Sequence, residues 1–134
     1  MAVEFDNKNT YKLQGTGSLG EVQIADEVVA IIAALATTEV DGVAKMFGNV
    51  PNELVSKLGM KNLSKGVKVS ITPEFVRIDL SIELKYGYSI PDVSVVVQGR
   101  VKNAIENMTG LTVDEVNVRI AGVALEKPVR VRNK

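Results

Sequence analysis

Strict alternation of apolar and polar residues marks the clearest element of the chain. Val76, Ile78, Leu80, Ile82 and Leu84 alternate with polar or charged residues as far as Lys85. Period two predicts a β-strand with one buried face. A one-residue slip in register would turn all five apolar side chains to water, at roughly 1.5–3 kcal/mol each. We therefore expect the register of this strand to be firmly fixed.

A second strand is predicted immediately before the first one. Apolar and polar residues also alternate from Val67 to Ile71, and Thr72-Pro73-Glu74 follows with proline in the position that turns favour. The two segments are therefore expected to form an antiparallel hairpin.

A long helix with capping residues at both of its ends is predicted after the hairpin. Ser89 can cap its first turn, Pro91 lies where a helix tolerates proline, and Gly110 is the usual left-handed cap residue. Helical spacing links one apolar stripe that we expect to be buried: Val93, Val97, Val101, Ala104, Ile105 and Met108. Val95 falls off this stripe, which makes it a candidate for surface contact.

The last strand shows alternation with one interruption. Val116, Val118 and Ile120 are expected to face inward, and Asn117 and Arg119 outward. At Ala121-Gly122 the inward pattern shifts to Val123 and Leu125, as a β-bulge would cause.

The first half of the chain is less regular. Residues 1–19 contain few apolar side chains and are predicted to form a flexible arm. Every residue from Val28 to Ala36 is apolar, which indicates a helix that is either buried on most sides or offers a face to another chain. Residues 51–58 are predicted to form a short second helix, with Pro51 in its first turn and Gly59 beyond its end.

These elements predict one α+β domain over residues 20–125, followed by a short basic tail at 126–134. Its sheet should contain about three main strands: the antiparallel hairpin, and a strand that follows the helical crossover. The helices should pack on one face of this sheet.

Composition excludes several kinds of chemistry. The 134 residues include no His and no Cys, which removes disulfides, thiolate nucleophiles and His-based catalysis. The carboxylates lack the spacing of a calcium loop, and Gly15 to Gly20, which spells GxGxxG, lacks the strand and helix of a dinucleotide site. We therefore assign no catalytic, cofactor-binding or metal-binding residues and predict that the protein is not an enzyme.

The outer face of the predicted sheet is the best candidate for an interaction surface. Sixteen basic and sixteen acidic residues give zero net charge, and no aromatic residue lies on this face, so the pattern does not favour nucleic-acid binding. With the exposed helix position, the candidate interaction residues are Lys68, Arg77, Asp79, Glu83, Val95, Asn117 and Arg119.

Three blocks of residues have a specific order and spacing. The first runs from Gly20-x-Val22-x-Ile24-Ala25 to Gly42-Val43, and the second is Lys65-Gly66-Val67-x-Val69. The third runs from Tyr86-Gly87 through Glu106-Asn107-Met108-Thr109-Gly110-Leu111 to Gly122-Val123. Together they resemble the alkaline-shock and general-stress protein family of Gram-positive bacteria. Asp26 departs from the family pattern, because members often have proline at this position.

The resemblance implies a non-enzymatic protein of cell-envelope stress homeostasis. It implies self-association and a membrane-anchored protein partner, which would hold a cytoplasmic protein at the inner face of the membrane. The polar N-terminus, which lacks the features of a signal peptide, likewise predicts a cytoplasmic protein. Two alternatives remain: a regulatory module linked to fatty-acid synthesis, and an RNA-binding module.

Overall fold

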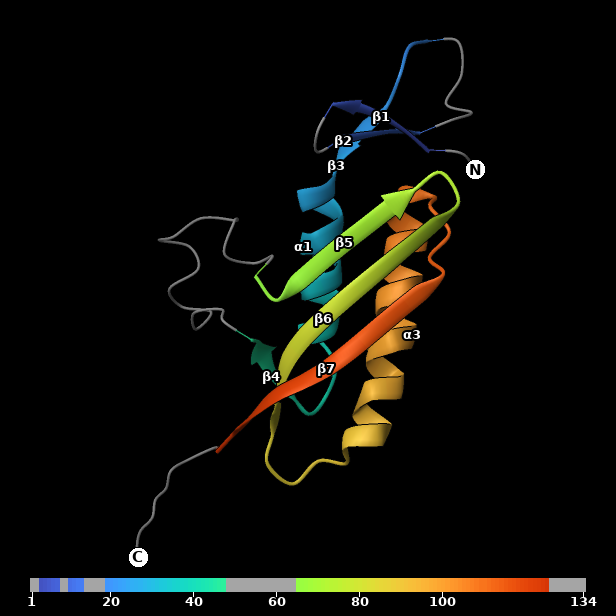
Figure 1. Ribbon diagram of the computed structural model, residues 1–134. Helices are drawn as coiled ribbons and strands as arrows, with labels where there is room; N and C mark the ends of the chain where they lie inside the picture. The colour runs from blue at the N-terminus through green and yellow to red at the C-terminus, as the bar shows by residue number, and fades with distance from the viewer. Residues whose placement is uncertain (1–2, 8–9, 14–18, 48–64, 126–134) are drawn as a thin grey trace, which may run out of the picture.

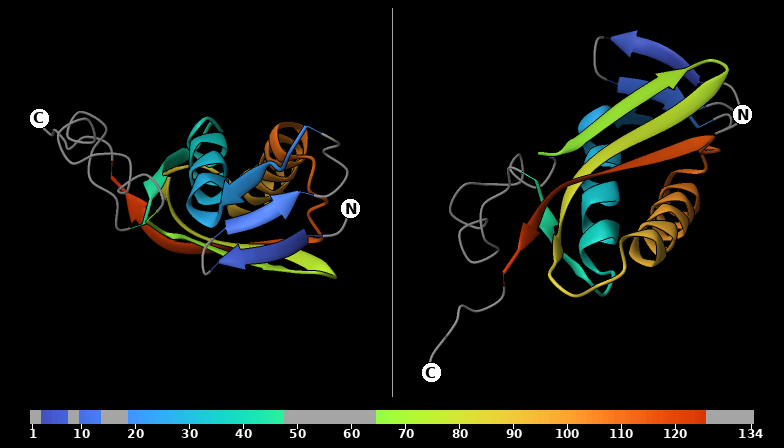
Figure 2. Two further views of the ribbon diagram at one scale, coloured as in Figure 1. Left: turned by 90° about the horizontal axis from the view of Figure 1, so that it is seen from above. Right: turned by 60° about the horizontal axis from the view of Figure 1, so that its bottom comes forward.

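In the described part of the chain, the fold consists of a twisted four-stranded main sheet with two helices on one of its faces, and a smaller three-stranded sheet formed by the N-terminal strands. The computed structural model describes residues 3–7, 10–13, 19–47 and 65–125. Figure 1 shows strands β5, β6 and β7 in front of helices α1 and α3, and Figure 2 shows both helices on the same side of the sheet. The elements are β1 (Val3–Asn7), β2 (Thr10–Leu13), β3 (Gln23–Ala25), α1 (Asp26–Thr38), β4 (Val43–Met46), β5 (Val67–Thr72), β6 (Phe75–Lys85), α3 (Ile90–Thr109) and β7 (Glu115–Ala124).

Strand β6 is the centre of the main sheet. It pairs antiparallel with β5 through its first half and with β4 near its end, on the same side, and it pairs parallel with β7 on the other side. The predicted hairpin and the predicted strand-helix-strand crossover are therefore both confirmed. The α+β class, with helices on one face of the sheet, is confirmed as well.

The bulge predicted in the last strand is also present. Ile82 pairs with Ile120, whereas Glu83 pairs with Gly122, so Ala121 is the extra residue of β7. The predicted inward positions beyond the bulge are wrong, because Val123 is 53% and Leu125 is 75% exposed. This end of β7 extends past the area that the two helices cover (Figure 1).

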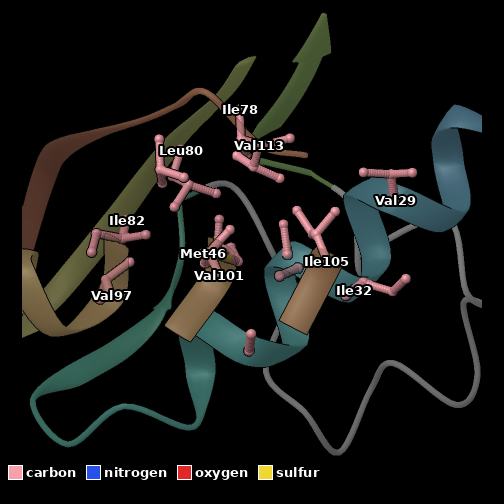
Figure 3. Packing of buried hydrophobic residues seen from close by; sticks show 14 of the residues in the cluster. Val29, Ile32, Met46, Ile78, Leu80, Ile82, Val97, Val101, Ile105 and Val113 are labelled. Atoms are coloured by element: carbon pink, nitrogen blue, oxygen red, sulfur yellow. The ribbon is translucent and has the colours of Figure 1, made fainter. Parts of the chain in front are cut away.

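The core lies between the inner face of the sheet and the two helices (Figure 3). The five alternating apolar residues of β6 are each at most 4% exposed, as the period-two pattern predicts. Val97, Val101 and Ile105 of α3 meet them with no exposed area. Burying side chains of this size contributes about 1.5–3 kcal/mol each.

The residues predicted to cap the two ends of α3 make the expected hydrogen bonds. The Asp92 N–H donates to Ser89 Oγ at 3.4 Å, which satisfies one of the donors that the first helical turn leaves free. Gly110 ends the helix with φ +80°, in the left-handed region, and its N–H donates to Glu106 O at 2.9 Å.

The N-terminal region, which the sequence predicts to be a flexible arm, contains two strands. Within residues 1–19 the structure places β1 and β2, which pair antiparallel, and β2 also pairs antiparallel with β3. Pairing to β3 gives the backbone of these residues hydrogen-bond partners, an opportunity that a count of apolar side chains does not reveal. The predicted short helix at 51–58 and the basic tail at 126–134 lie outside the described residues.

A charged pair holds the loop after α3 against the helix. Glu106 Oε2 accepts from Lys102 Nζ at 2.7 Å and from the Val113 N–H at 2.9 Å, while Lys102 Nζ also donates to Val113 O at 2.8 Å. The hydrogen bond from Lys102, followed by the one from Val113, lowers the pKa of Glu106 below its usual value of 4.5.

Replacing Glu106 with glutamine should therefore change the dependence of stability on pH. A carboxyl with a lowered pKa in the folded state stabilises the protein above its unfolded pKa, and this contribution disappears as the pH falls through the folded value. We expect Glu106→Gln to lower the melting temperature at pH 7, and the two melting temperatures to converge when the pH falls well below 4.5. A difference that stays constant between pH 7 and pH 3 would contradict this role.

Candidate interaction surfaces

Six of the seven predicted interaction residues lie on the sheet face that points away from the helices. Lys68, Asn117 and Arg119 are exposed, and Arg77, Asp79 and Glu83 are partly exposed. Val95 lies apart from them on α3, with 65% of its surface exposed. The structure therefore brings the polar residues together on β5, β6 and β7, and it leaves Val95 on a different surface.

The centre of the outer face is a small polar network. Asp79 lies between Lys68 of β5 and Asn117 of β7 in the strand register. Asn117 Nδ2 donates to Asp79 Oδ1 at 2.9 Å and to Glu115 Oε1 at 3.3 Å, and Arg77 Nε lies 3.4 Å from Asp79 Oδ2. The Arg77 and Asp79 side chains are 40% and 34% exposed, although Arg77 Nε itself is buried, so water screens most of the network. The network is therefore a weak stabiliser and a specific polar surface.

Two other predicted residues have different surroundings. Glu83 is opposite Lys45 of β4 and Gly122 of β7, and its Cγ would lie 3.2 Å from a Cβ added at Gly122. Arg119 is opposite Ser81 in the register. Within the described ranges no acidic side chain lies close enough to pair with the Arg119 guanidinium.

An apolar groove between α1 and α3 is a second candidate interaction surface. It has a volume of about 460 Å³, and apart from Glu39 all the side chains around it are apolar. The groove is lined by Val28, Ile31, Ile32, Leu35, Ala36, Glu39, Ala104 and Met108.

The first helix has both a buried side and an exposed side. One side of α1 is buried, with Val29 and Ala33 fully inaccessible, whereas Val28 and Leu35 remain 46% and 45% exposed. The all-apolar sequence of α1 therefore fills the core and also lines the groove. Met108 was predicted to be buried with the α3 stripe, but it is 71% exposed at the rim of this groove.

The described ranges of the chain show three further features. Within these ranges, no cluster of acidic residues has the arrangement of a metal site. The lowered pKa of Glu106 is explained by its contacts with Lys102 and Val113. No helix among the described elements has the length and apolar character needed to cross a bilayer.

The fold and these surfaces define a small α+β protein with an apolar groove on its helical layer and a polar outer sheet face. The model of the alkaline shock protein 23 family, described as having a cell envelope-related function, matches residues 14–125. The chain belongs to this family. The resemblance to alkaline-shock and general-stress proteins is thereby confirmed.

Similar proteins occur in Gram-positive bacteria. YqhY of Bacillus subtilis (strain 168) is 41% identical over 108 residues, which cover 81% of this chain and 80% of that protein. YloU of the same strain is 33% identical over 111 residues, covering 81% and 92%. A stress response regulator gls24 homologue of Streptococcus pyogenes serotype M3 is 30% identical over 117 residues, covering 87% and 65%. Neither the family description nor these names indicate an enzyme.

Proposed function

We propose that this chain is a non-enzymatic interaction protein of cell-envelope stress homeostasis, which acts by self-association and by binding protein partners. In this proposal it is cytoplasmic and reaches the inner face of the cell membrane through a membrane-anchored partner. The envelope-related function of the family and the stress-response name of the streptococcal relative support the biological process. The exposed surfaces of the fold support the mode of action.

The observation that supports binding most strongly is the apolar groove between α1 and α3. Val28, Leu35 and Met108 are exposed to water. A partner that covered them would gain roughly 25 cal/mol of binding free energy for each Å² of apolar surface buried. A groove between two helices suits an amphipathic helix, whose apolar residues recur at i, i+3, i+4 and i+7. We therefore assign the groove to an amphipathic helical segment of the membrane-anchored partner.

The polar contacts at one end of the groove support a defined orientation for this segment. Glu39 lines the groove, and its Oε1 lies 3.8 Å from Arg100 Nη1 of α3. A polar group at the margin of an apolar surface contributes specificity more than affinity. A basic residue at the matching end of the partner helix would pair with Glu39.

The composition supports the non-enzymatic part of the proposal. Without His or Cys, the chain lacks the residues most often used for general base and thiolate catalysis near neutral pH. On the outer face, the Asp79 carboxylate contacts the Asn117 amide and the Arg77 guanidinium.

Placing a charge in the groove should release the protein from membranes. In Leu35→Glu an unpaired carboxylate would be buried beneath the partner, which costs more than the roughly 1.4 kcal/mol that corresponds to a ten-fold loss of affinity. We expect the share of protein that sediments with membranes from lysed cells to fall by about ten-fold or more.

Val123→Glu is the matched control, because it introduces the same charge at a similarly exposed apolar residue on β7. This variant should sediment with membranes as the unsubstituted protein does. Equal sedimentation of all three proteins would contradict binding through the groove. An unsubstituted protein that stays monomeric at high concentration and never sediments with membranes would contradict the proposed function as a whole.

A further inference from the structure

Strand β7 has one unpaired edge in the described part of the chain. Its other edge pairs with β6, and no described strand lies beyond it. Val76 of β6 accepts a hydrogen bond from the Asp114 N–H at 2.9 Å, and its own N–H donates to Asp114 Oδ2 at 2.8 Å. The even-numbered residues of β6 therefore direct their backbone groups toward β7.

This pattern determines which residues of β7 present their backbone at the open edge. In parallel pairing, a residue of one strand bonds to the two residues that flank its partner. Ile78, which is opposite Val116, therefore bonds to residues 115 and 117, and the backbone groups of Val116, Val118 and Ile120 point away from β6. Gln98 Nε2 donates to Val116 O at 2.9 Å, as expected for a carbonyl that β6 does not use.

The side chains along this edge are self-complementary. Glu115, Asn117 and Arg119 occupy successive outward positions, with the acidic residue two positions before Asn117 and the basic residue two positions after it. If a second copy pairs antiparallel with its two-fold axis at Asn117, each Glu115 faces the Arg119 of the other copy. In the same register Val116 faces Val118, so the outward backbone groups of the two edges also meet. The Val116 carbonyl, which already accepts from Gln98 Nε2, would use its second lone pair for the facing Val118 N–H.

We propose that β7 is the dimerisation edge of the protein and that its partner is a second copy of this chain, paired antiparallel in the register that places Glu115 opposite Arg119. This inference rests on the self-association in the proposed function and specifies its surface. Pairing would join the two main sheets into one continuous sheet across β7. The two strands would gain two cross-strand ion pairs, and Arg119 would gain a carboxylate partner that the described part of its own chain does not supply.

Two features near the edge fit this arrangement. The bulge at Ala121 lies beyond the paired stretch, so Glu115 to Ile120 remains regular and able to accept a strand. Val95 lies three residues before Gln98 and therefore on the same side of α3, next to the β7 edge. The helices of the two copies would approach each other there, which would cover a side chain that is 65% exposed in one copy.

The test exchanges the charges and measures dimer dissociation by sedimentation equilibrium. In a dimer of the Arg119→Glu variant, both facing pairs consist of two glutamates. In a dimer of the Glu115→Arg variant, both facing pairs consist of two arginines. Each variant should dimerise on the order of 10-fold more weakly or worse. An equimolar mixture of the two variants should form a heterodimer of near-original strength, because both facing pairs are again opposite in charge. Melting temperatures of the single variants establish that each remains folded.

Recovery in the mixture supports the proposed register. A protein whose self-association is unaffected by either substitution, or is weakened without recovery in the mixture, would overturn the β7 assignment and leave self-association through another surface intact. An unsubstituted protein that remains monomeric up to the highest soluble concentration would overturn this inference together with the self-association part of the proposed function.

Discussion

Replacing Leu80 with alanine is expected to lower the free energy of unfolding by about 2–5 kcal/mol. Leu80 is 1% exposed and lies on the inner face of β6, in the cluster that joins the sheet to α1 and α3. The truncation removes apolar contacts from both layers and leaves a cavity. Because domains are commonly stable by about 5–15 kcal/mol, this single change would remove a large part of the total.

Ser81→Ala is the matched control for this experiment. Ser81 is the next residue along β6, and it lies on the opposite, partly exposed face of the sheet. Its substitution should change stability by less than about 0.5 kcal/mol. Urea denaturation of both variants, with the slope m unchanged, would measure the difference. A loss below about 1 kcal/mol for Leu80→Ala would contradict the assignment of this face as the core.

Replacing Gly66 with alanine is expected to lower the free energy of unfolding by the next-largest amount after Leu80→Ala. Gly66 has φ +89°, and a Cβ added there would lie 3.0 Å from Phe47 O and 3.0 Å from Ser81 O. The Gly66 carbonyl also accepts from the Ser81 N–H at 2.8 Å. The left-handed backbone costs about 1–3 kcal/mol for a side chain that disfavours it, and crowding of two carbonyl groups adds to that cost.

Gly87→Ala is the control that separates the cost of the left-handed backbone from the cost of crowding. It has a similar φ of +99°, but an added Cβ would meet nothing within 4 Å. Gly87→Ala should therefore show the backbone cost alone, and Gly66→Ala should be the more destabilising of the two in the same denaturation experiment. Equal losses would show that the junction of β4, β5 and β6 relaxes without cost.

The elements with the strongest local signals could be predicted from the sequence. The period-two pattern of β6 defines both of its faces without knowledge of the neighbours, because a slip would expose five apolar side chains. The ends of α3 depend on short-range contacts, such as that between Ser89 and the Asp92 N–H, which the sequence spacing already contains.

Contacts between distant segments could not be predicted in the same way. The α3 stripe gives the angular position of Met108 but not which element covers it, and at this end of the helix the stripe borders the open groove beside α1. The pairing of β2 with β3 depends on backbone hydrogen bonds, for which sparse apolar side chains give little signal.

Local sequence patterns predict part of the candidate surfaces, and contacts between distant segments determine the rest. Alternation along β6 and β7 indicated that Asp79 and Asn117 face outward, whereas their mutual hydrogen bond requires the parallel register of these two strands. The continuous apolar run of α1 indicated a spare face but did not show which residues form it. Only packing against α3 leaves Val28 and Leu35 beside Met108.

The proposal that a membrane-anchored partner binds the groove is tested most directly by site-specific photo-crosslinking at position 35 in living cells, because the crosslink captures any protein that contacts this position. A photoreactive residue in place of Leu35 should crosslink one membrane-anchored protein, and the same residue in place of Val123 should not. Membrane fractionation followed by mass spectrometry would identify the product. Absence of a protein crosslink at position 35, or equal crosslinking from positions 35 and 123, would contradict the groove as the partner-binding surface.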